Sequence, residues 1–364
     1  MAVPLDRLEA RLRAAASAVA VARADLLLVT TPANLAYLSG LRTSAGVLAL
    51  GHESAWLVMD GRYADLAATA LAGWRGPVLE PVPPGGSYEE TLGALIGRSG
   101  ARTVAVEAGH MTVGRLAGLR RAAEESGGLE WREIDGLVEA LRVVKDDWER
   151  RLLREAGGRL AAVAACILPK VSAGRTERQV AWDIDVALRS AGFDRPAFET
   201  IVASGPHAAR PHHRPTDRQL DRGELVLLDF GGQLDGYSVD LSRTVPLGDV
   251  GRRRRHWIEA VAAAQAAAIA AIAPGRPPSA VDAAARARLA AEGLADYFVH
   301  STGHGLGLDV HERPTIGPRG DATGPLAEHM VFTVEPGVYV PGDGGVRIED
   351  DVLVTATGAD GLTF

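Results

Sequence analysis

Short apolar runs separated by amphipathic stretches dominate the first third of the chain. The runs LLLVT, GVLAL, AWLVM and TVAVE have the length and composition of buried strands, and alanine- and leucine-rich stretches lie between them. Leu5, Leu8 and Leu12 recur at the spacing of one helix face, which predicts a surface helix near the N-terminus. The pattern from about residue 25 to residue 131 therefore predicts a small α/β domain.

The pattern changes near residues 140–146. Lys145, Asp146 and Asp147 precede a long helical run, and the two acids suit the N-cap and first turn of a helix. A chain of 364 residues also exceeds the size at which a single core usually keeps growing. We therefore expect two domains, residues 1–143 and 144–364.

The second region contains an internal repeat without gaps. Each copy has a helix, a glycine turn, a second helix and another glycine, and a strand that carries an acidic residue follows. The residues that match at a constant offset are Gly174 with Gly275, Val180 with Val281, and Gly192 with Gly293. The repeat predicts two related halves.

Four acidic residues lie in apolar, strand-like runs of this region, namely Asp229, Asp240, Glu335 and Glu349. A lone ionised carboxylate is costly to bury, so something must compensate for these charges. The strand period of two puts each acid on a face with a polar neighbour: Glu335 with Thr333, Glu349 with Arg347, and Asp240 with Ser242 and Thr244. If the two halves meet through paired strands, two divalent cations would balance the four charges.

The segment VHSTGHGLGLDVHE adds three histidines, His300, His304 and His311. His304 stands between glycines that would let the backbone approach a metal ion, and we expect it to be the imidazole ligand. Oxygen-rich ligation with one imidazole suits Mn, Co, Zn or Fe better than a structural zinc site, which would need thiolates. The single cysteine, Cys166, lies in the apolar run AAVAACIL and is expected to be an inert core residue.

The bulk composition narrows the possible partners. A net charge of −7 argues against a nucleic-acid partner, and RRRRHW at residues 252–257 is better interpreted as the solvated start of a helix. No apolar run reaches the roughly 20 residues that span a bilayer. Asp6 and Glu9 disfavour a secretion signal, and the lone cysteine favours a reducing compartment. We expect a cytoplasmic protein that acts on small molecules or peptides.

Together these motifs resemble those of the proline-specific branch of the pita-bread metallopeptidases, the family of Xaa-Pro aminopeptidases and prolidases. The resemblance rests on DFGGQLDGYSVDLSRT, STGHGLGLDVHE, FTVEPGVY and GVRIEDDVLVT, in that order. NLAYLSG and DGRYADLA resemble the creatinase-type N-terminal domain. The resemblance implies an α/β (α+β) chain, with a creatinase-like N-terminal domain followed by a pita-bread catalytic domain that has a pseudo-twofold repeat.

The resemblance also implies a two-metal centre. Asp229 would bind one ion, His304 and Glu335 the other, while Asp240 and Glu349 would bridge the two. Manganese is the expected metal, with zinc or cobalt as alternatives. Water activated by the ions would attack the scissile carbonyl, and Glu335 would take up and relay the proton.

Other residues acquire roles from the same resemblance. Substrate binding and stabilisation of the tetrahedral intermediate fall to His212, His300 and His311. His213 is the less favoured neighbour, and His207 stands where the family usually has asparagine and is expected to be a solvated loop residue. Arg347 is expected to orient Glu349 or to neutralise the site through a charge-assisted bond.

Several activities fit these residues. An Xaa-Pro aminopeptidase is the expected activity, and an Xaa-Pro dipeptidase, or prolidase, is the alternative. A dipeptidase must satisfy a free carboxylate, and some prolidases have an arginine where this chain has Thr315. Arg313 is the candidate substitute for that arginine. A non-catalytic pita-bread binding protein and a creatinase-like amidinohydrolase are disfavoured, because such relatives lack metal ligands that this chain retains. A methionine aminopeptidase usually lacks the N-terminal domain. The resemblance further implies a homodimer.

Overall fold

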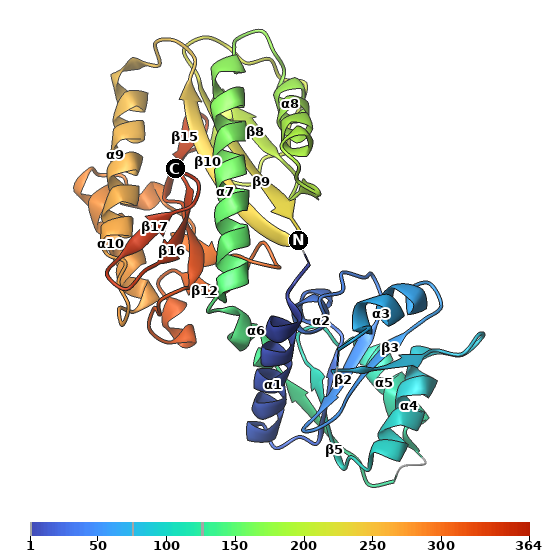
Figure 1. Cartoon of the computed structure of the whole chain (residues 1–364). Coiled ribbons are helices and arrows are strands. Elements are labelled where there is room, and N and C mark those ends of the chain that lie inside the picture. The colour runs from blue at the N-terminus through green and yellow to red at the C-terminus, as the bar shows by residue number, and fades with distance from the viewer. Residues whose placement is uncertain (1, 75, 125–126) are drawn as a thin grey trace. The chain divides into compact units, whose positions relative to one another are not determined.

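A computed structural model describes residues 2–74, 76–124 and 127–364 (Figure 1). The chain divides into two compact units, Met1–Arg142 and Val143–Phe364. Among the described residues, no helix combines the length and the apolar character needed to cross a membrane.

The N-terminal unit is built on a six-stranded sheet with the order β4-β3-β2-β1-β5-β6. Its strands are β1 (Leu26–Val29), β2 (Val47–Gly51), β3 (Ala55–Met59), β4 (Val78–Pro81), β5 (Thr103–Glu107) and β6 (Glu130–Ile134). Its helices are α1 (Leu5–Val21), α2 (Pro32–Ser39), α3 (Ala64–Leu71), α4 (Tyr88–Ser99), α5 (Val113–Ala122) and α6 (Leu137–Arg142). The four apolar runs are β1, β2, β3 and β5, as predicted.

Strands β4 and β6 were not predicted, because they form the two edges of this sheet. Their sequences, VLEP and EWREI, contain charged residues, and most of their side chains are exposed or half-buried. Edge strands tolerate such residues, since only one side of each strand is paired. The buried strands therefore have the clearer sequence signal.

The C-terminal unit pairs each half of the repeat with its own sheet. Its helices are α7 (Asp147–Ile167), α8 (Glu177–Ser190), α9 (Gly251–Ala270) and α10 (Pro278–Ala291). One sheet contains β7 (Arg195–Pro196), β8 (Ile201–Ser204), β9 (Leu225–Leu234) and β10 (Tyr237–Pro246). The other contains β11 (Gly303–Gly305), β12 (Glu312–Ile316), β13 (Val331–Val334), β16 (Asp350–Val354) and β17 (Ala359–Gly361), and β14 (Gly337–Val340) pairs with β15 (Gly344–Arg347).

The helices of each half pack on its own strands. Helix α7 contacts β9 and β10, and α8 contacts β8, whereas α9 contacts β13 to β15 and α10 contacts β12 (Figure 1). Helix α7 begins as predicted, because the carboxylate of its N-cap Asp146 accepts bonds from the backbone N–H groups of Trp148 and Glu149. Trp257 and Phe332 are buried in the core of the second half.

The predicted repeat is confirmed by its backbone. Gly174 and Gly275 both follow the first helix of a half, with φ angles of 89° and 83°. Gly192 and Gly293 both follow the second helix, with φ angles of 86° and 70°. All four lie in the left-handed region that glycine adopts without steric cost. The matched valines, Val180 and Val281, are both buried.

The two halves meet along β10 and β16. The backbone N–H of Asp240 donates to Asp351 Oδ2 at 2.9 Å, and that of Glu349 donates to the carbonyl oxygen of Ser242 at 3.1 Å. These bonds bring the acid-bearing strands of the two halves side by side.

The prediction that Cys166 is a core residue is wrong. Its side chain is exposed, and Lys170 Nζ lies 3.1 Å from its sulfur. The buried residues at this end of α7 are Val163, Ala164 and Ile167, so the helical period turns Cys166 outward. The surrounding apolar run consists largely of alanine, which suits either face.

Candidate active site and metal centre

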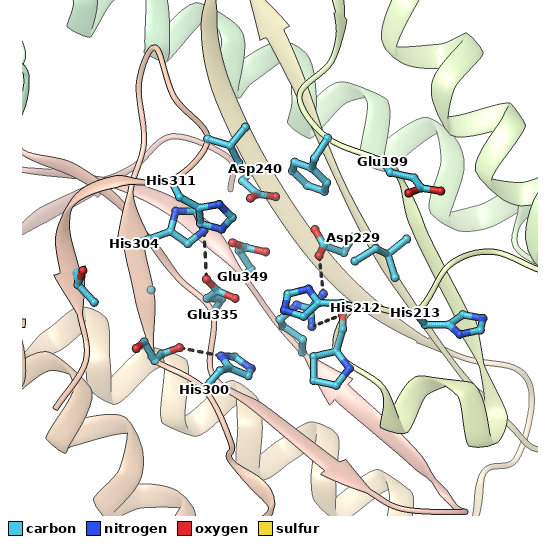
Figure 2. Close-up of a pocket in the computed structure, with 18 of the residues that line it drawn as sticks. Glu199, His212, His213, Asp229, Asp240, His300, His304, His311, Glu335 and Glu349 are labelled. Atoms are coloured by element: carbon cyan, nitrogen blue, oxygen red, sulfur yellow. Dashed lines mark hydrogen bonds and ion pairs between the residues drawn. The ribbon is translucent and has the colours of Figure 1, made fainter. Parts of the chain in front are cut away.

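A cavity of about 540 Å³ lies in the C-terminal unit. It brings together all the residues that the sequence singled out as ligands or substrate contacts: His212, Asp229, Asp240, His300, His304, His311, Glu335, Arg347 and Glu349. Figure 2 shows the acids facing one another, with His304 and His311 on one side and His212 on the other. Phe198, Glu199, Arg214 and Thr315 also line it.

Strands β9 and β10 position the first two acids. Asp229 lies opposite Ser242 in the antiparallel ladder, and Asp240 precedes Ser242 by two residues. Because side chains alternate along a strand, Asp240 and Ser242 share the face on which Asp229 lies. Both acids are buried.

The other two acids follow strands of the second half. Glu335 comes directly after β13, and Thr333 Oγ1 donates to its Oε1 at 3.1 Å. Glu349 joins β15 to β16, and Ser242 Oγ donates to its Oε2 at 2.6 Å. The first bond confirms the predicted shared face of Thr333 and Glu335, and the second links the two halves at the site.

Burial makes the acids strongly electrostatically coupled. Burial is the main cause that raises the pKa of Glu335 to about 7, and the charge of Asp229 raises this pKa further. Burial and neighbouring carboxylates also raise the pKa values of Asp240 and Glu349 well above their usual range. A bound cation would oppose this repulsion and favour the ionised acids.

These residues fit divalent metal ions. One carboxylate oxygen each of Asp229 and Glu349 is buried and has no hydrogen-bond partner among the described residues. The ligand atoms of Asp240, His304 and Glu349 all lie within 4.8 Å of one another. Hard carboxylate oxygens with one imidazole are a typical donor set for Mn²⁺, Co²⁺ or Zn²⁺.

The ring of His304 is oriented as a ligand. Its Nδ1 lies 3.1 Å from the carbonyl oxygen of Gly305, which can only accept, so Nδ1 carries the proton. Its Nε2 faces Glu335 Oε1 at 3.4 Å (Figure 2). Burial, with the neighbouring His311, lowers the pKa of His304 to about 3, so the imidazole is neutral, as metal binding requires.

Strand packing requires the glycines on both sides of His304. A Cβ added to Gly303 would lie 1.8 Å from the carbonyl oxygen of Thr333. A Cβ added to Gly305 would lie 2.1 Å from the carbonyl oxygen of Arg313. The glycines therefore allow β11 to lie between β13 and β12, which is a second cause beside the expected approach to a metal ion. The sequence could not distinguish the two causes, because the strand pairing was unknown.

Tyr339 is a site residue that the sequence analysis missed. Arg347 Nη1 donates to its hydroxyl oxygen at 2.7 Å, and that hydroxyl lies 2.8 Å from His300 Nε2. His300 Nδ1 donates to the carbonyl oxygen of Ser301 at 2.7 Å, so Nε2 accepts from the tyrosine. Burial raises the pKa of Tyr339 to about 12 and keeps it a neutral donor. The sequence signal for Tyr339 was its place in the run EPGVY, where it shares the strand period of two with Glu335.

Arg347 contacts the acids differently from the predicted arrangement. Its carboxylate partner is Asp229, and it reaches Glu349 only through Ser242, whose Oγ accepts from Arg347 Nε at 2.8 Å. The side chain is buried, so the guanidinium supplies a fixed positive charge within the cluster. Of the two predicted roles, neutralisation is the direct one.

His212 and His213 both line the cavity, but their rings point in different directions. His212 faces the cavity, whereas His213 turns away from the acids and its Nε2 bonds to Glu177 at 2.9 Å (Figure 2). His207 is not a solvated loop residue, because its Nδ1 lies 3.0 Å from Glu177 and its side chain is only 24% exposed. The prediction failed because Glu177 is distant in sequence.

Thr315, and not Arg313, lines the cavity. Arg313 therefore does not take the place that was suggested for it. A different cation, Arg214, lies at the cavity, where its Nε is 3.2 Å from Glu199 Oε2. Their side chains are 84% and 63% exposed, so water screens this ion pair.

Comparisons with known proteins agree with this fold and site. Residues 151–356 match the metallopeptidase family M24, and residues 11–144 match the creatinase/prolidase N-terminal domain. The Xaa-Pro dipeptidase of Pyrococcus horikoshii is 31% identical over 341 residues, which cover 93% of this chain and 92% of the relative. The chain belongs to metallopeptidase family M24, and it is a metal-dependent hydrolase.

Two solved structures extend the comparison. The Xaa-Pro dipeptidase from Bacillus anthracis matches with a TM-score of 0.92 and 31% identity, covering 98% of this chain and 97% of that one. The X-Pro aminopeptidase from Thermotoga maritima matches with a TM-score of 0.85 and 29% identity, covering 96% and 97%. The expected combination of a creatinase-like domain and a pita-bread domain is confirmed.

Proposed function

We propose that this chain is a dinuclear-metal Xaa-Pro dipeptidase, a prolidase. The observation that carries the proposal is the convergence of three buried acids, the largely buried Glu335 and one neutral imidazole in a single cavity. Relatives that cover nearly the whole chain and bear the name Xaa-Pro dipeptidase support the substrate class. The proposal therefore reverses the order of the two activities expected from the sequence.

In this proposal the metal ligands are divided as the family resemblance implies. Asp229 would hold one ion, His304 and Glu335 would hold the other, and Asp240 and Glu349 would contact both, with manganese as the favoured metal. Bound ions would lower the pKa of water and polarise the scissile carbonyl.

The chain's own side chains supply the remaining chemistry. Glu335 accepts the proton of the attacking water on a carboxylate oxygen and passes it to the leaving imino nitrogen of proline. His212 and His311 donate to the developing oxyanion. His300 has both ring nitrogens engaged, by Ser301 and Tyr339, so the predicted donation from His300 to the intermediate is not part of this proposal.

Arg214 is the proposed partner of the free carboxylate of a dipeptide. Among the described residues, the only arginine or lysine side chains that line the cavity are Arg214 and Arg347. Arg347 is committed to Asp229, Ser242 and Tyr339. Arg214 has only its screened pair with Glu199, which a substrate carboxylate can replace.

An Xaa-Pro aminopeptidase is the second candidate. Thr315 offers no charge at the position where some prolidases have arginine, which favours a groove that admits a longer peptide. The relative from Thermotoga maritima bears that name.

The ratio of kcat/KM for Ala-Pro to kcat/KM for Ala-Pro-Ala separates the candidates. A dipeptidase gives a ratio far above one, and Arg214→Ala lowers it by roughly tenfold or more through the loss of a charge-assisted bond. Arg319→Ala, an exposed arginine outside the cavity, is the control. A ratio below one that Arg214→Ala leaves unchanged would establish the aminopeptidase.

We further propose that the enzyme is a cytoplasmic homodimer. The family resemblance supports the dimer, and the lone cysteine supports a reducing compartment.

A further inference from the structure

Glu177 is a buried acid outside the metal site with an unusual number of hydrogen bonds. It lies in the first turn of α8 and is fully buried. Its Oε1 accepts from Ser204 N and Oγ and from His207 Nδ1, at 2.8 to 3.0 Å. Its Oε2 accepts from His213 Nε2 and from Thr216 N and Oγ1, at 2.7 to 3.0 Å.

The charge of this carboxylate is stabilised by its partners. Burial alone would raise the pKa of Glu177, but hydrogen bonds from His213, Thr216 and Ser204 outweigh it and lower the pKa to about 2. The carboxylate is therefore ionised at neutral pH. In this state it accepts charge-assisted hydrogen bonds from residues near both ends of one chain segment.

The bonded residues flank His212. Ser204 and His207 precede it, and His213 and Thr216 follow it, so one carboxylate fixes both ends of the segment 204–216. His212 itself makes no hydrogen bond to another described residue and faces the cavity (Figure 2). Its placement therefore depends on the backbone that Glu177 holds.

The second half of the repeat has a similar arrangement. Asp282 is a buried acid on α10 and accepts from Thr302 N at 3.2 Å and from Thr302 Oγ1 at 2.8 Å. Thr302 lies between His300 and His304. In each half, an acid on the second helix holds the segment that brings histidines to the cavity.

Glu177, His207 and His213 also have ligand atoms within 4.8 Å of one another, as a metal site would. A carboxylate offers about four lone pairs, and Glu177 already accepts six hydrogen bonds. The carboxylate has no lone pair left for an ion, so the cluster is better suited to holding a loop.

We propose that Glu177 is a positioning residue that sets the His212 imidazole at the cavity, through a network to which His207 and His213 contribute. The inference rests on the proposed function, because the role of His212 is to donate to the reacting carbonyl. Misplacing such a group costs catalysis even when the metal ligands are intact.

A double-mutant cycle on Ala-Pro hydrolysis by the full-length, metal-loaded protein tests this. Glu177→Gln is expected to lower kcat/KM by roughly 10²-fold, at unchanged metal content. In the His212→Ala background, the same change is expected to cost no more than about twofold, because the group it positions is absent. An equal loss in both backgrounds would show that Glu177 acts independently of His212 and would overturn the proposal.

Hydrogen exchange measured by mass spectrometry provides a readout that does not need activity. Faster exchange confined to residues 204–216 in Glu177→Gln is expected, and unchanged exchange there would overturn the proposal. If the wild-type protein exchanges slowly in this segment but does not cleave Ala-Pro, only the proposed function fails.

His207→Ala serves if Glu177→Gln does not fold, since His207 is partly exposed and contributes one bond of the network. It is expected to show the same coupling to His212 at a smaller fold-change. Elemental analysis tests the other interpretation, that the cluster of Glu177, His207 and His213 binds a metal ion. A third ion per chain that disappears in His207→Ala would show that the cluster binds metal and would contradict the positioning role.

Discussion

His304 and His311 have ring centroids 4.0 Å apart, yet their surroundings assign them different tasks. His304 is largely buried, with one ring nitrogen bonded to the carbonyl oxygen of Gly305 and the other aimed at the acids. His311 is more exposed, and its pKa is lowered by partial burial of the ring and by the charge of His212. The first arrangement suits a ligand and the second suits a donor to substrate.

This difference predicts the behaviour of His311→Ala. Removing one donor to a developing oxyanion is expected to lower kcat by roughly 10²-fold, while two ions per chain remain bound. His256→Ala, on the outer helix α9, is the control and should leave kcat unchanged. If His311→Ala instead loses metal and keeps its turnover per bound ion pair, the roles of His304 and His311 are exchanged.

Among the elements, the sequence predicted those whose pattern is local. The buried strands, the first turn of α7 and the glycines of the repeat follow from burial, capping and left-handed backbone, which act within a few residues. The four acids and His304 were identified because apolar strands rarely carry them. Tyr339 and Glu177 were missed, since their partners are distant in sequence and only the tertiary fold brings them together. The edge strands were missed because their charged, exposed residues lack the signal of a buried strand.

The close strand approach at Gly303 gives a prediction about stability. Gly303→Ala is expected to lower the free energy of unfolding by about 1–3 kcal/mol and to weaken metal binding, because the new methyl group would push β11 away from β13. Urea titration of the metal-free and metal-loaded protein measures both effects.

Gly158→Ala is the matched control for this substitution. Gly158 is an exposed residue of α7, and an added Cβ would meet nothing within 4 Å. Alanine in an open helical position should raise stability by roughly 0.5–1 kcal/mol. A Gly303→Ala variant as stable as wild type would show that β11 does not depend on this contact.

At the scale of the whole molecule, the proposed homodimer has a measurable consequence. A homodimer predicts a sedimentation-equilibrium mass of twice the 38.2 kDa chain at micromolar concentration. If the metal-binding acids take no part in dimerisation, this mass should be the same with and without bound metal. A monomer at that concentration would contradict the proposed dimer.

The two-metal centre is the central claim, and metal stoichiometry measured together with activity tests it most directly. Chelated protein should be inactive, and Ala-Pro hydrolysis should return as Mn²⁺ is added up to two equivalents per chain. Asp240→Asn, which replaces a bridging carboxylate with a neutral amide, should bind fewer than two ions and remain nearly inactive at any Mn²⁺ concentration. Full turnover by protein that elemental analysis shows to be metal-free, or two-ion occupancy with normal turnover in Asp240→Asn, would contradict the account.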